Sequence, residues 1–143
     1  MRKLVILVMG LSGSGKTSLA KKLFNSLNKE YKTLWLNADK ERSHTHNDDF
    51  SLSGRMKQSI HIRDVIEKSE VDIVICDLIA PTPSLRRVID PDIIVWMDTV
   101  SESKYLDTDS MFIPPTSPDF VIRVWGSNDH TKIVSTTRRL LWK

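Results

Sequence analysis

A glycine-rich stretch near the amino terminus has the residue types and spacing of a phosphate-binding loop. Residues 10–17, Gly-Leu-Ser-Gly-Ser-Gly-Lys-Thr, fit the pattern G-x-x-x-x-G-K-[ST] at every required position. The glycines allow the loop amides to converge on a polyphosphate. Lys16 can then reach the β- and γ-phosphates, and the Thr17 hydroxyl can bind Mg²⁺. The predicted nucleotide-binding residues are Gly10, Ser12, Gly13, Ser14, Gly15, Lys16, Thr17 and Ser18.

The segments on either side of this loop supply the strand and the helix that it needs. Residues 2–9 begin with Arg2 and Lys3 and continue as an unbroken apolar run rich in β-branched side chains, which is typical of a buried strand. From Lys16 to Asn28 the apolar side chains recur at helical spacing. The first turn of that helix would direct its unpaired N–H groups and the positive end of its dipole at the phosphates. This order favours a nucleotide site over a chance glycine-rich turn.

Length and composition indicate one compact domain without a membrane span. The 143 residues are 40% hydrophobic and 27% charged, which is ordinary for a globular chain. No apolar run approaches the roughly 18 residues of a membrane span. The net charge of +3 is mild and suits a small anionic ligand, so nucleic acid is not the expected partner. Cys76 is the only cysteine, and its apolar neighbours predict a buried, inert thiol in a reducing, cytoplasmic setting.

Further apolar runs predict four more strands, at residues 32–37, 71–79, 92–98 and 120–125. Helical patterns occur at residues 50–69, 84–89 and 132–142. Because strands alternate with helices, we expect an α/β fold whose five-stranded parallel sheet is covered by helices on both faces. Ligands of such sheets bind beyond the carboxyl ends of the strands. Residues that follow a strand are therefore the first candidates for the site.

Acidic side chains follow two of these strands. Residues 37–42, Asn-Ala-Asp-Lys-Glu-Arg, place Asp39 and Arg42 near the mouth of the phosphate loop, although they could equally form a solvated loop with an incidental ion pair. Asp77, near the end of the third strand, fits the acidic residue that holds hydrated Mg²⁺ in P-loop enzymes, or it could cap a loop. Thr17 and Asp77 are thus the predicted metal-binding residues.

Two connecting segments differ in what they predict. Residues 43–49 contain His44 and His46 but lack the spacing of a zinc site, so we expect a flexible connector there. Residues 99–119 have no strong periodicity and contain several prolines. A connection of that length inside a compact domain is usually functional, so we expect a lid over the site.

Beyond the phosphate loop, the chain carries further short motifs in a characteristic order. They are Ser18-Leu19-Ala20; Asp39 with Arg42; Phe50, Ser51 and Arg55; Ile79-Ala80-Pro81 with Arg86; Met97-Asp98-Thr99; and Phe112 with residues 114–119. In this combination the chain resembles the adenylylsulfate (APS) kinase family, within the P-loop kinases. The resemblance covers nearly the whole chain, although only the phosphate loop matches strictly.

This resemblance implies a three-layer P-loop kinase sandwich as a single domain over residues 1–143, with a short lid at about residues 99–119. It implies ATP and Mg²⁺ as cofactors and phosphorylation of the 3′-hydroxyl of adenylyl sulfate, which gives 3′-phosphoadenylyl sulfate and ADP. Lys16 would offset charge on the transferred phosphoryl group, and Asp39 would orient or deprotonate the acceptor hydroxyl. The implied substrate-binding residues are Asp39, Arg42, Phe50, Arg55, Ser59, Ile79, Arg86, Lys104 and Phe112.

Arginines and aromatic rings among these residues suit an adenylylated anion. A guanidinium fork matches sulfate and phosphate geometry better than an ammonium group does. Phe50 and Phe112 could sandwich the acceptor's adenine, or they could simply pack in the core. Residues 125–128, Trp-Gly-Ser-Asn, follow the last strand, where P-loop kinases often pack the donor base.

Departures from the family's pattern leave the acceptor open. Asn37 and Ala38 stand where the family has Asp and Gly, and Ala80 replaces a Ser. Asp77 stands in place of a small residue, and the lid motif is shortened, with Lys104 as the candidate for its lysine. The chain could therefore act on another acceptor, such as a polynucleotide 5′-end or a small metabolite, or bind ATP without transferring phosphate. The sequence is compatible with a homodimer, but no pattern specifies the oligomeric state.

Overall fold

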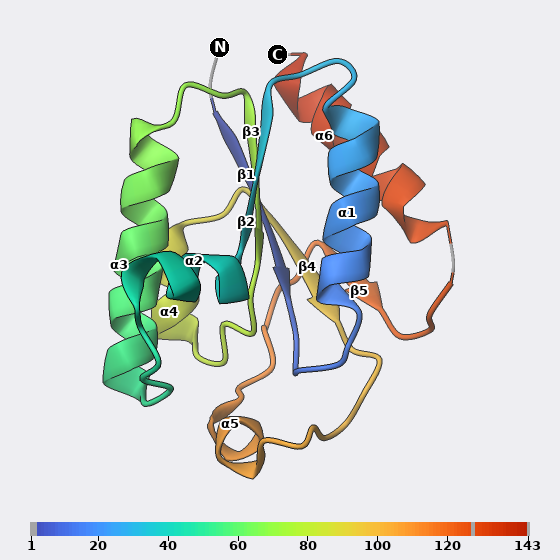
Figure 1. Ribbon diagram of the computed structural model, residues 1–143. Coiled ribbons are helices and arrows are strands. Elements are labelled where there is room, and N and C mark those ends of the chain that lie inside the picture. Colours follow the sequence, from blue (N-terminus) through green and yellow to red (C-terminus); the bar gives the residue numbers. More distant parts are fainter. Residues whose placement is uncertain (1–2, 127, 143) are drawn as a thin grey trace.

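The computed structural model describes residues 3–126 and 128–142, and within these residues five strands form one parallel sheet (Figure 1). The strands are β1 (Leu4–Met9), β2 (Thr33–Asn37), β3 (Ile73–Asp77), β4 (Ile93–Met97) and β5 (Phe120–Ile122). Their order is β2-β3-β1-β4-β5, and every neighbouring pair is parallel. The predicted α/β fold with a five-stranded parallel sheet is confirmed. Because β1 is the central strand, the phosphate loop emerges at the middle of the carboxyl edge.

Helices cover both faces of the sheet and give the fold three layers (Figure 1). They are α1 (Lys16–Leu27), α2 (Ala38–Thr45), α3 (Leu52–Lys68), α4 (Pro83–Ile89), α5 (Leu106–Met111) and α6 (Asp129–Leu141). On one face lie α1 and α6, on the other α3 and α4, while α2 and α5 lie toward the carboxyl edge. The described chain begins and ends at the opposite edge. Of the described helices, none is long and apolar enough to cross a membrane.

The central strand divides its side chains between two hydrophobic cores. Ile6 and Val8 join the core beneath α1 and α6, whereas Leu7 and Met9 join the core beneath α3 and α4. All four side chains are fully buried. A strand buried on both faces needs apolar residues at every position, which explains its continuous apolar run. Packing from both sides fixes the end of β1 that carries the phosphate loop.

Several predicted strands are shorter in the structure. β3 ends at Asp77 rather than residue 79, and β5 ends at Ile122 rather than residue 125. β5 is an edge strand with β4 as its pairing partner, so little holds its apolar sequence in an extended ladder. Arg2, in the predicted first strand, lies outside the described residues.

The segment after β2 forms the helix α2, which continues to residue 45. The expectation of a flexible connector over residues 43–49 is therefore wrong for residues 43–45. The Asn37 side chain caps α2 by accepting a hydrogen bond of 3.2 Å from the Lys40 amide. Asp39 and Glu41 in the first turn favour the positive end of the helix dipole. The helix ends at His46, whose backbone has a φ of 55°. The capped amino terminus therefore stabilises this helix, although few of its residues are apolar.

Two further segments show features that the sequence patterns do not specify. Arg55, in the helix predicted at residues 50–69, is buried, because the first turns of α3 face the carboxyl edge of the sheet rather than solvent. The predicted lid region, residues 99–119, contains the short helix α5, in which Thr108 is buried. The lid region has few apolar residues, so its sequence shows no helical periodicity from which α5 could be predicted.

Candidate active site

The phosphate loop adopts the backbone geometry that its glycines allow. Gly10, Gly13 and Gly15 all have positive φ angles, of 149°, 81° and 98°. A Cβ atom at Gly10 would lie 2.6 Å from the Met97 carbonyl oxygen, so no larger residue fits there without a shift. Gly15 precedes α1, and no side chain caps that helix. The loop and the first turn of α1 thus present their amides to the carboxyl edge.

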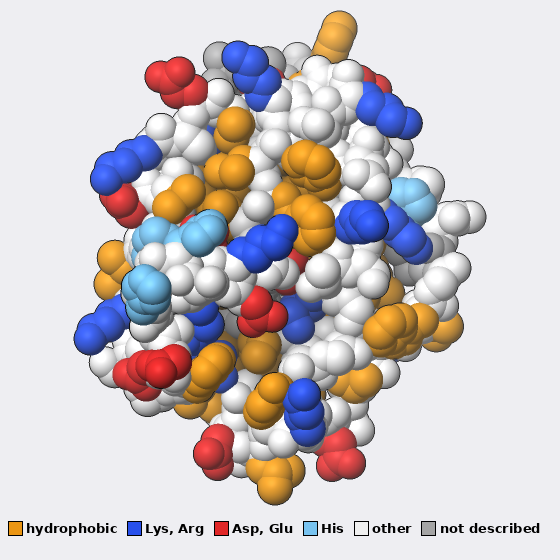
Figure 2. Space-filling view, viewed as in Figure 1, with side chains coloured by type: hydrophobic (Ala, Val, Ile, Leu, Met, Phe, Trp, Pro, Cys, Tyr) orange, Lys and Arg blue, Asp and Glu red, His pale blue; other side chains and the backbone are white. Residues whose placement is uncertain are grey.

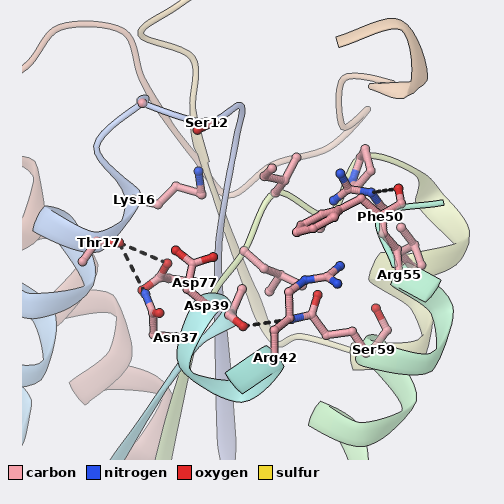
Figure 3. Close-up of a pocket in the computed structure, with 18 residues that line it drawn as sticks. Ser12, Lys16, Thr17, Asn37, Asp39, Arg42, Phe50, Arg55, Ser59 and Asp77 are labelled. Atoms are coloured by element: carbon pink, nitrogen blue, oxygen red, sulfur yellow. Dashed lines mark hydrogen bonds between the residues drawn. The ribbon is translucent and has the colours of Figure 1, made fainter. Parts of the chain in front are cut away.

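Lys16 lies in an acidic environment inside this loop. Its Nζ donates a hydrogen bond of 2.9 Å to the Leu11 carbonyl oxygen. Burial lowers the pKa of Lys16, and the nearby carboxylates of Asp77 and Asp39 oppose that effect. The ammonium group therefore faces the carboxylates of Asp77 and Asp39 across the mouth of the loop (Figure 3).

Asp77 is the centre of a polar cluster at the ends of β2 and β3. The Thr17 hydroxyl donates to Asp77 Oδ1 at 3.4 Å, and Asn37 Nδ2 donates to Asp77 Oδ2 at 3.1 Å (Figure 3). Trp35 Nε1 donates to the same Oδ2 at 2.8 Å. Hydroxyl and carboxylate oxygens are the ligands that Mg²⁺ prefers, so Thr17 and Asp77 fit a hydrated Mg²⁺. Among the described residues, no three His, Cys, Asp or Glu side chains gather as a metal site of their own.

A cavity of about 210 Å³ extends from the phosphate loop to α3. The space-filling view is hollowed there, where basic, acidic and hydrophobic side chains meet (Figure 2). Of the residues predicted to bind ligands, those that line it are Ser12, Gly13, Lys16, Thr17, Asp39, Arg42, Phe50, Arg55, Ser59, Asp77 and Ile79. The fold thus brings the phosphate loop and most of the implied acceptor-binding residues into one cavity.

Arg42 lies on the side of the cavity away from the phosphate loop. Its Nη1 donates to the carbonyl oxygens of Asn47 and Asp49 at 3.2 and 3.1 Å, whereas its buried Nη2 has no hydrogen-bond partner in the described structure. The guanidinium lies over the Phe50 ring, 4.1 Å from the centroid. Burial lowers the pKa of Arg42, and the carboxylate of Asp39 opposes this first among its neighbours. A buried guanidinium nitrogen without a partner has a donor available for a charge-assisted hydrogen bond to an anion.

Arg55 and Ser59 project from α3 toward the same cavity (Figure 3). Arg55 Nε donates to the Phe50 carbonyl oxygen at 2.9 Å, and its Nη2 donates to Thr108 Oγ1 at 2.8 Å. Burial lowers the pKa of Arg55, and the positive charge of Arg42 lowers it further. Ser59 Oγ is buried and, like Arg42 Nη2, has no hydrogen-bond partner in the part of the chain that the structure describes.

The comparison with known families agrees with this geometry. A family model described as adenylylsulphate kinase matches residues 2–98, from the first strand through the fourth. The chain belongs to the adenylylsulphate kinase family. It is therefore an ATP-dependent P-loop kinase, as the sequence predicts. No curated protein matches the chain.

Solved structures share the kinase fold at low sequence identity. The crystal structure of APE1195 has a TM-score of 0.78 and 19% identity, and the alignment covers 98% of this chain and 97% of that one. The APS kinase CysC of Mycobacterium tuberculosis, in complex with AMPPNP and APS, has a TM-score of 0.76, 21% identity and 99% coverage of both chains. A hexameric APS kinase from Thiobacillus denitrificans has a TM-score of 0.74 and 21% identity over 99% of this chain but 30% of that chain.

Three residues implied to bind the acceptor of this kinase do not line the cavity. Arg86 is buried, and it donates to the carbonyl oxygens of Ala80, at 2.8 Å, and Ile113. Phe112 stacks on Trp96 with ring centroids 6.4 Å apart. Lys104 is exposed, with its Nζ 5.2 Å from the centroid of the Tyr105 ring. The structure therefore gives Arg86 and Phe112 structural contacts and does not bring Phe112 to the cavity beside Phe50.

A second, more apolar groove lies on the other side of the kinase's phosphate loop. It is lined by Gly15, Ser18, Leu19, Lys22, Met97, Ile122, Val124, Trp125 and Gly126. The Trp125 ring is close enough that a Cβ at Gly15 would lie 3.4 Å from it. This is where the sequence predicted the donor base, although Ser127 of that segment lies outside the described residues.

Sequence reasoning missed Trp35 and Thr108 in the kinase's site region, and it left Gln58 and Ser59 as alternatives at one position of α3. Trp35 lies within an apolar strand, and only its indole N–H, which needs a partner when buried, could have pointed to Asp77. Gln58 Nε2 donates to the Ala38 carbonyl oxygen at 3.0 Å and fastens α3 to α2. Thr108 lies in the lid region, where no pattern indicated that one threonine would be buried against Arg55.

Proposed function

We propose that this kinase transfers the γ-phosphoryl group of ATP to the 3′-hydroxyl of adenylyl sulfate, giving 3′-phosphoadenylyl sulfate and ADP. Family membership supports the reaction class, and the cavity supports an anionic acceptor. The observation that carries the proposal is the position of Asp39. Its carboxylate is within electrostatic reach of both Lys16, in the phosphate loop, and Arg42, across the cavity.

This placement suits a group that handles an acceptor hydroxyl. A phosphoryl acceptor must lie between the donor phosphates and the residues that grip the rest of the acceptor. Asp39 lies at that junction and lines the cavity (Figure 3). Its carboxylate would accept the hydroxyl proton as the new O–P bond forms and as the bond between the γ-phosphorus and the bridging oxygen of ADP breaks. Lys16 and the loop amides would offset the charge on the transferred group.

The acceptor's sulfate and phosphate would bind at the far side of the cavity. Arg42 Nη2 and Ser59 Oγ are buried donors that have no partner in the described structure, and both residues line this wall. Leaving a buried donor unpaired costs free energy, so an oxyanion that pairs with both would be bound favourably. The Phe50 ring, which is 56% exposed, offers a surface on which the acceptor's adenine can stack.

Mg²⁺ belongs to this proposal as the partner of ATP. Thr17 and Asp77 would hold it through their oxygens, and the ion would neutralise charge on the β- and γ-phosphates. The residues themselves would bind the phosphates, orient the acceptor and exclude water from between them.

A coupled assay for ADP release tests the acceptor directly. We expect adenylyl sulfate to stimulate ADP release well above the rate with water, whereas adenosine 5′-monophosphate, a 5′-hydroxyl oligonucleotide and small polyol acceptors should not. If saturating adenylyl sulfate gives no more ADP than water, the proposed acceptor is wrong. Stimulation by another acceptor would then identify that class, and no stimulation by any would indicate ATP binding without transfer.

Variants of two arginines separate acceptor binding from general damage. Arg42→Gln removes a guanidinium that lines the cavity, whereas Arg138→Gln removes one that pairs with Glu30 on the surface. We expect Arg42→Gln to raise the KM for adenylyl sulfate by about tenfold or more, since a hydrogen bond to a charged group contributes about 1.5–3 kcal/mol. Arg138→Gln should leave that KM unchanged. Equal effects of the two variants would contradict the assignment of Arg42.

A further inference from the structure

We infer that Trp35 is a positioning residue for Asp77: its indole N–H holds one carboxylate oxygen so that the other faces Thr17 and the metal-bound nucleotide. This inference rests on the proposed use of MgATP, and it concerns a residue outside the cavity lining. Trp35 Nε1 lies 2.8 Å from Asp77 Oδ2, which is the shortest of the three contacts to this carboxylate.

The sheet register places these residues together. β2 and β3 are parallel, with Asn37 paired to Asp77 and Trp35 paired to Ile75. Alternate residues of a strand point to the same face, so Trp35 and Asn37 lie on one face of β2, beside Asp77 on the neighbouring strand. The Trp35 ring also packs on Phe24 of α1, with centroids 6.2 Å apart. The indole is therefore fixed both by the strand and by the helix that follows the phosphate loop.

The contacts divide the two oxygens of Asp77 between different tasks. Oδ2 accepts from Trp35 Nε1 and from Asn37 Nδ2, while Oδ1 faces the Thr17 hydroxyl. An indole N–H can only donate, so the contact from Trp35 uses Oδ2 as an acceptor and places no competing acceptor beside the carboxylate. Two donors on one oxygen leave the carboxylate little freedom to rotate. Oδ1 is thereby aimed at the place where Thr17 and Asp77 would hold Mg²⁺.

Asn37 completes this arrangement because it is an amide. A carboxylate at position 37, paired in register with Asp77, would put two like charges within about 3 Å, the distance that now separates Asn37 Nδ2 from Asp77 Oδ2. The amide donates instead, and its oxygen caps α2. One acid with two donors thus stands at the ends of these two strands. Residues that orient a metal ligand commonly change metal affinity by 10–100-fold when they are replaced.

The experiment measures the metal-dependent gain in nucleotide affinity, without acceptor and therefore without turnover. The dissociation constant of ATP is measured calorimetrically in excess MgCl₂ and in EDTA, and the ratio of the two is the gain. Trp35→Phe keeps the ring that packs on Phe24 but removes the N–H. We expect Trp35→Phe to reduce the gain by about tenfold, with the affinity in EDTA unchanged.

Two further variants make the result decisive. Trp142→Phe alters a tryptophan that is 90% exposed and should leave both affinities as in the wild type. Asn37→Ser keeps a good helix cap but removes the amide donor, so its gain should fall in the same direction as that of Trp35→Phe. Intrinsic fluorescence adds a second readout, because the change in tryptophan emission on adding MgCl₂ to the ATP complex should be smaller in Trp35→Phe than in Trp142→Phe.

The outcomes distinguish this inference from the proposed function. A gain in Trp35→Phe equal to that of the wild type overturns the role of Trp35 and leaves the proposed function standing. Equal losses of affinity in MgCl₂ and in EDTA would show a merely structural role and would also overturn it. If the wild type binds ATP equally well with and without Mg²⁺, both the inference and the proposed metal site fail. Adenylyl sulfate is absent throughout, so a wrong acceptor cannot affect the result.

Discussion

Arg55 Nη2 donates a hydrogen bond of 2.8 Å to Thr108 Oγ1 and so joins the cavity wall on α3 to the helix α5 of the lid region. Both residues are buried, at 7% and 6% exposure, and Thr108 is the buried residue of α5. An arginine implied to bind the acceptor thus also fastens the lid region. A ligand that moved the Arg55 guanidinium toward the cavity would therefore also act on the hydrogen bond that holds α5.

Replacing Thr108 by Val should destabilise the protein by removing this anchor. Val keeps the volume of the side chain but has no oxygen, so the buried Arg55 Nη2 loses its partner. Leaving such a donor unpaired costs about 1–3 kcal/mol. We expect the free energy of unfolding, from urea denaturation, to fall by about that amount. Thr108→Ser retains the hydroxyl and should lose clearly less; equal losses in both variants would show that the hydrogen bond is not the cause.

Replacing Gly54 by Ala should also destabilise the protein, although alanine is the better helix former. Gly54 is in the first turn of α3, and its Cβ would overlap the carbonyl oxygen of Asp49. That backbone atom also accepts a hydrogen bond from Arg42, so it cannot move without disturbing the cavity wall. We expect a loss of about 1–3 kcal/mol in the free energy of unfolding, as for other overpacked sites.

The matched control for this variant is Ser53→Ala, because Ser53 is the exposed neighbour in the same helical turn. Its replacement should leave stability unchanged or slightly raise it through helix propensity. If Gly54→Ala and Ser53→Ala have the same free energy of unfolding, the backbone at Asp49 can move at little cost and the prediction is wrong.

Replacing Lys16 by Ala should abolish most phosphoryl transfer with whichever acceptor proves active. Lys16 lies at the mouth of the phosphate loop, where it would offset charge on the transferred group. Removing one such preorganised group lowers kcat by roughly two to three orders of magnitude. Lys21→Ala, on the exposed side of α1, is the control and should retain the wild-type rate of ADP formation. A Lys16→Ala rate within a few per cent of wild type would contradict the assigned role.

The buried thiol of Cys76 should make stability depend on pH in the alkaline range. Burial raises the pKa of Cys76 to about 12, whereas the usual value is 9.0. Since the folded pKa is the higher one, this contribution to stability is complete below about pH 9 and is lost as the pH rises toward 12. The difference in unfolding free energy between wild type and Cys76→Ala should therefore shrink by up to about 1.4 kcal/mol per pH unit above pH 9. Parallel curves, from urea denaturation at each pH, would contradict this.

The sequence was enough to predict the fold and the place of the phosphate loop because both depend on local patterns. The continuous apolar run of β1 requires burial on both faces, and the spacing from Gly10 to Thr17 determines where the loop amides point. The α2 helix was missed since its stability comes from the Asn37 cap and from first-turn acids rather than from apolar periodicity.

The acceptor half was harder to predict because it depends on contacts between distant segments. No sequence pattern distinguishes Arg86 from Arg55 as a ligand-binding residue. In the structure, however, Arg86 donates hydrogen bonds to the carbonyl oxygens of Ala80 and Ile113, whereas Arg55 lines the cavity. Phe112 could have met the adenine or packed in the core, and it stacks on Trp96, on the face of the sheet that α3 and α4 cover. Only the three-dimensional packing determines that Arg55 rather than Arg86, and Phe50 rather than Phe112, can contact a ligand in the cavity.

The described chain begins and ends at the edge of the sheet opposite the cavity (Figure 1). A fluorescent reporter, an affinity tag or a neighbouring domain joined at either end would therefore start from the side of the molecule that ligands do not approach. Immobilising the protein through its ends would leave the route to Lys16 and Arg42 open to solution. Because of this orientation, the domain can be joined to other domains at either end without covering the cavity.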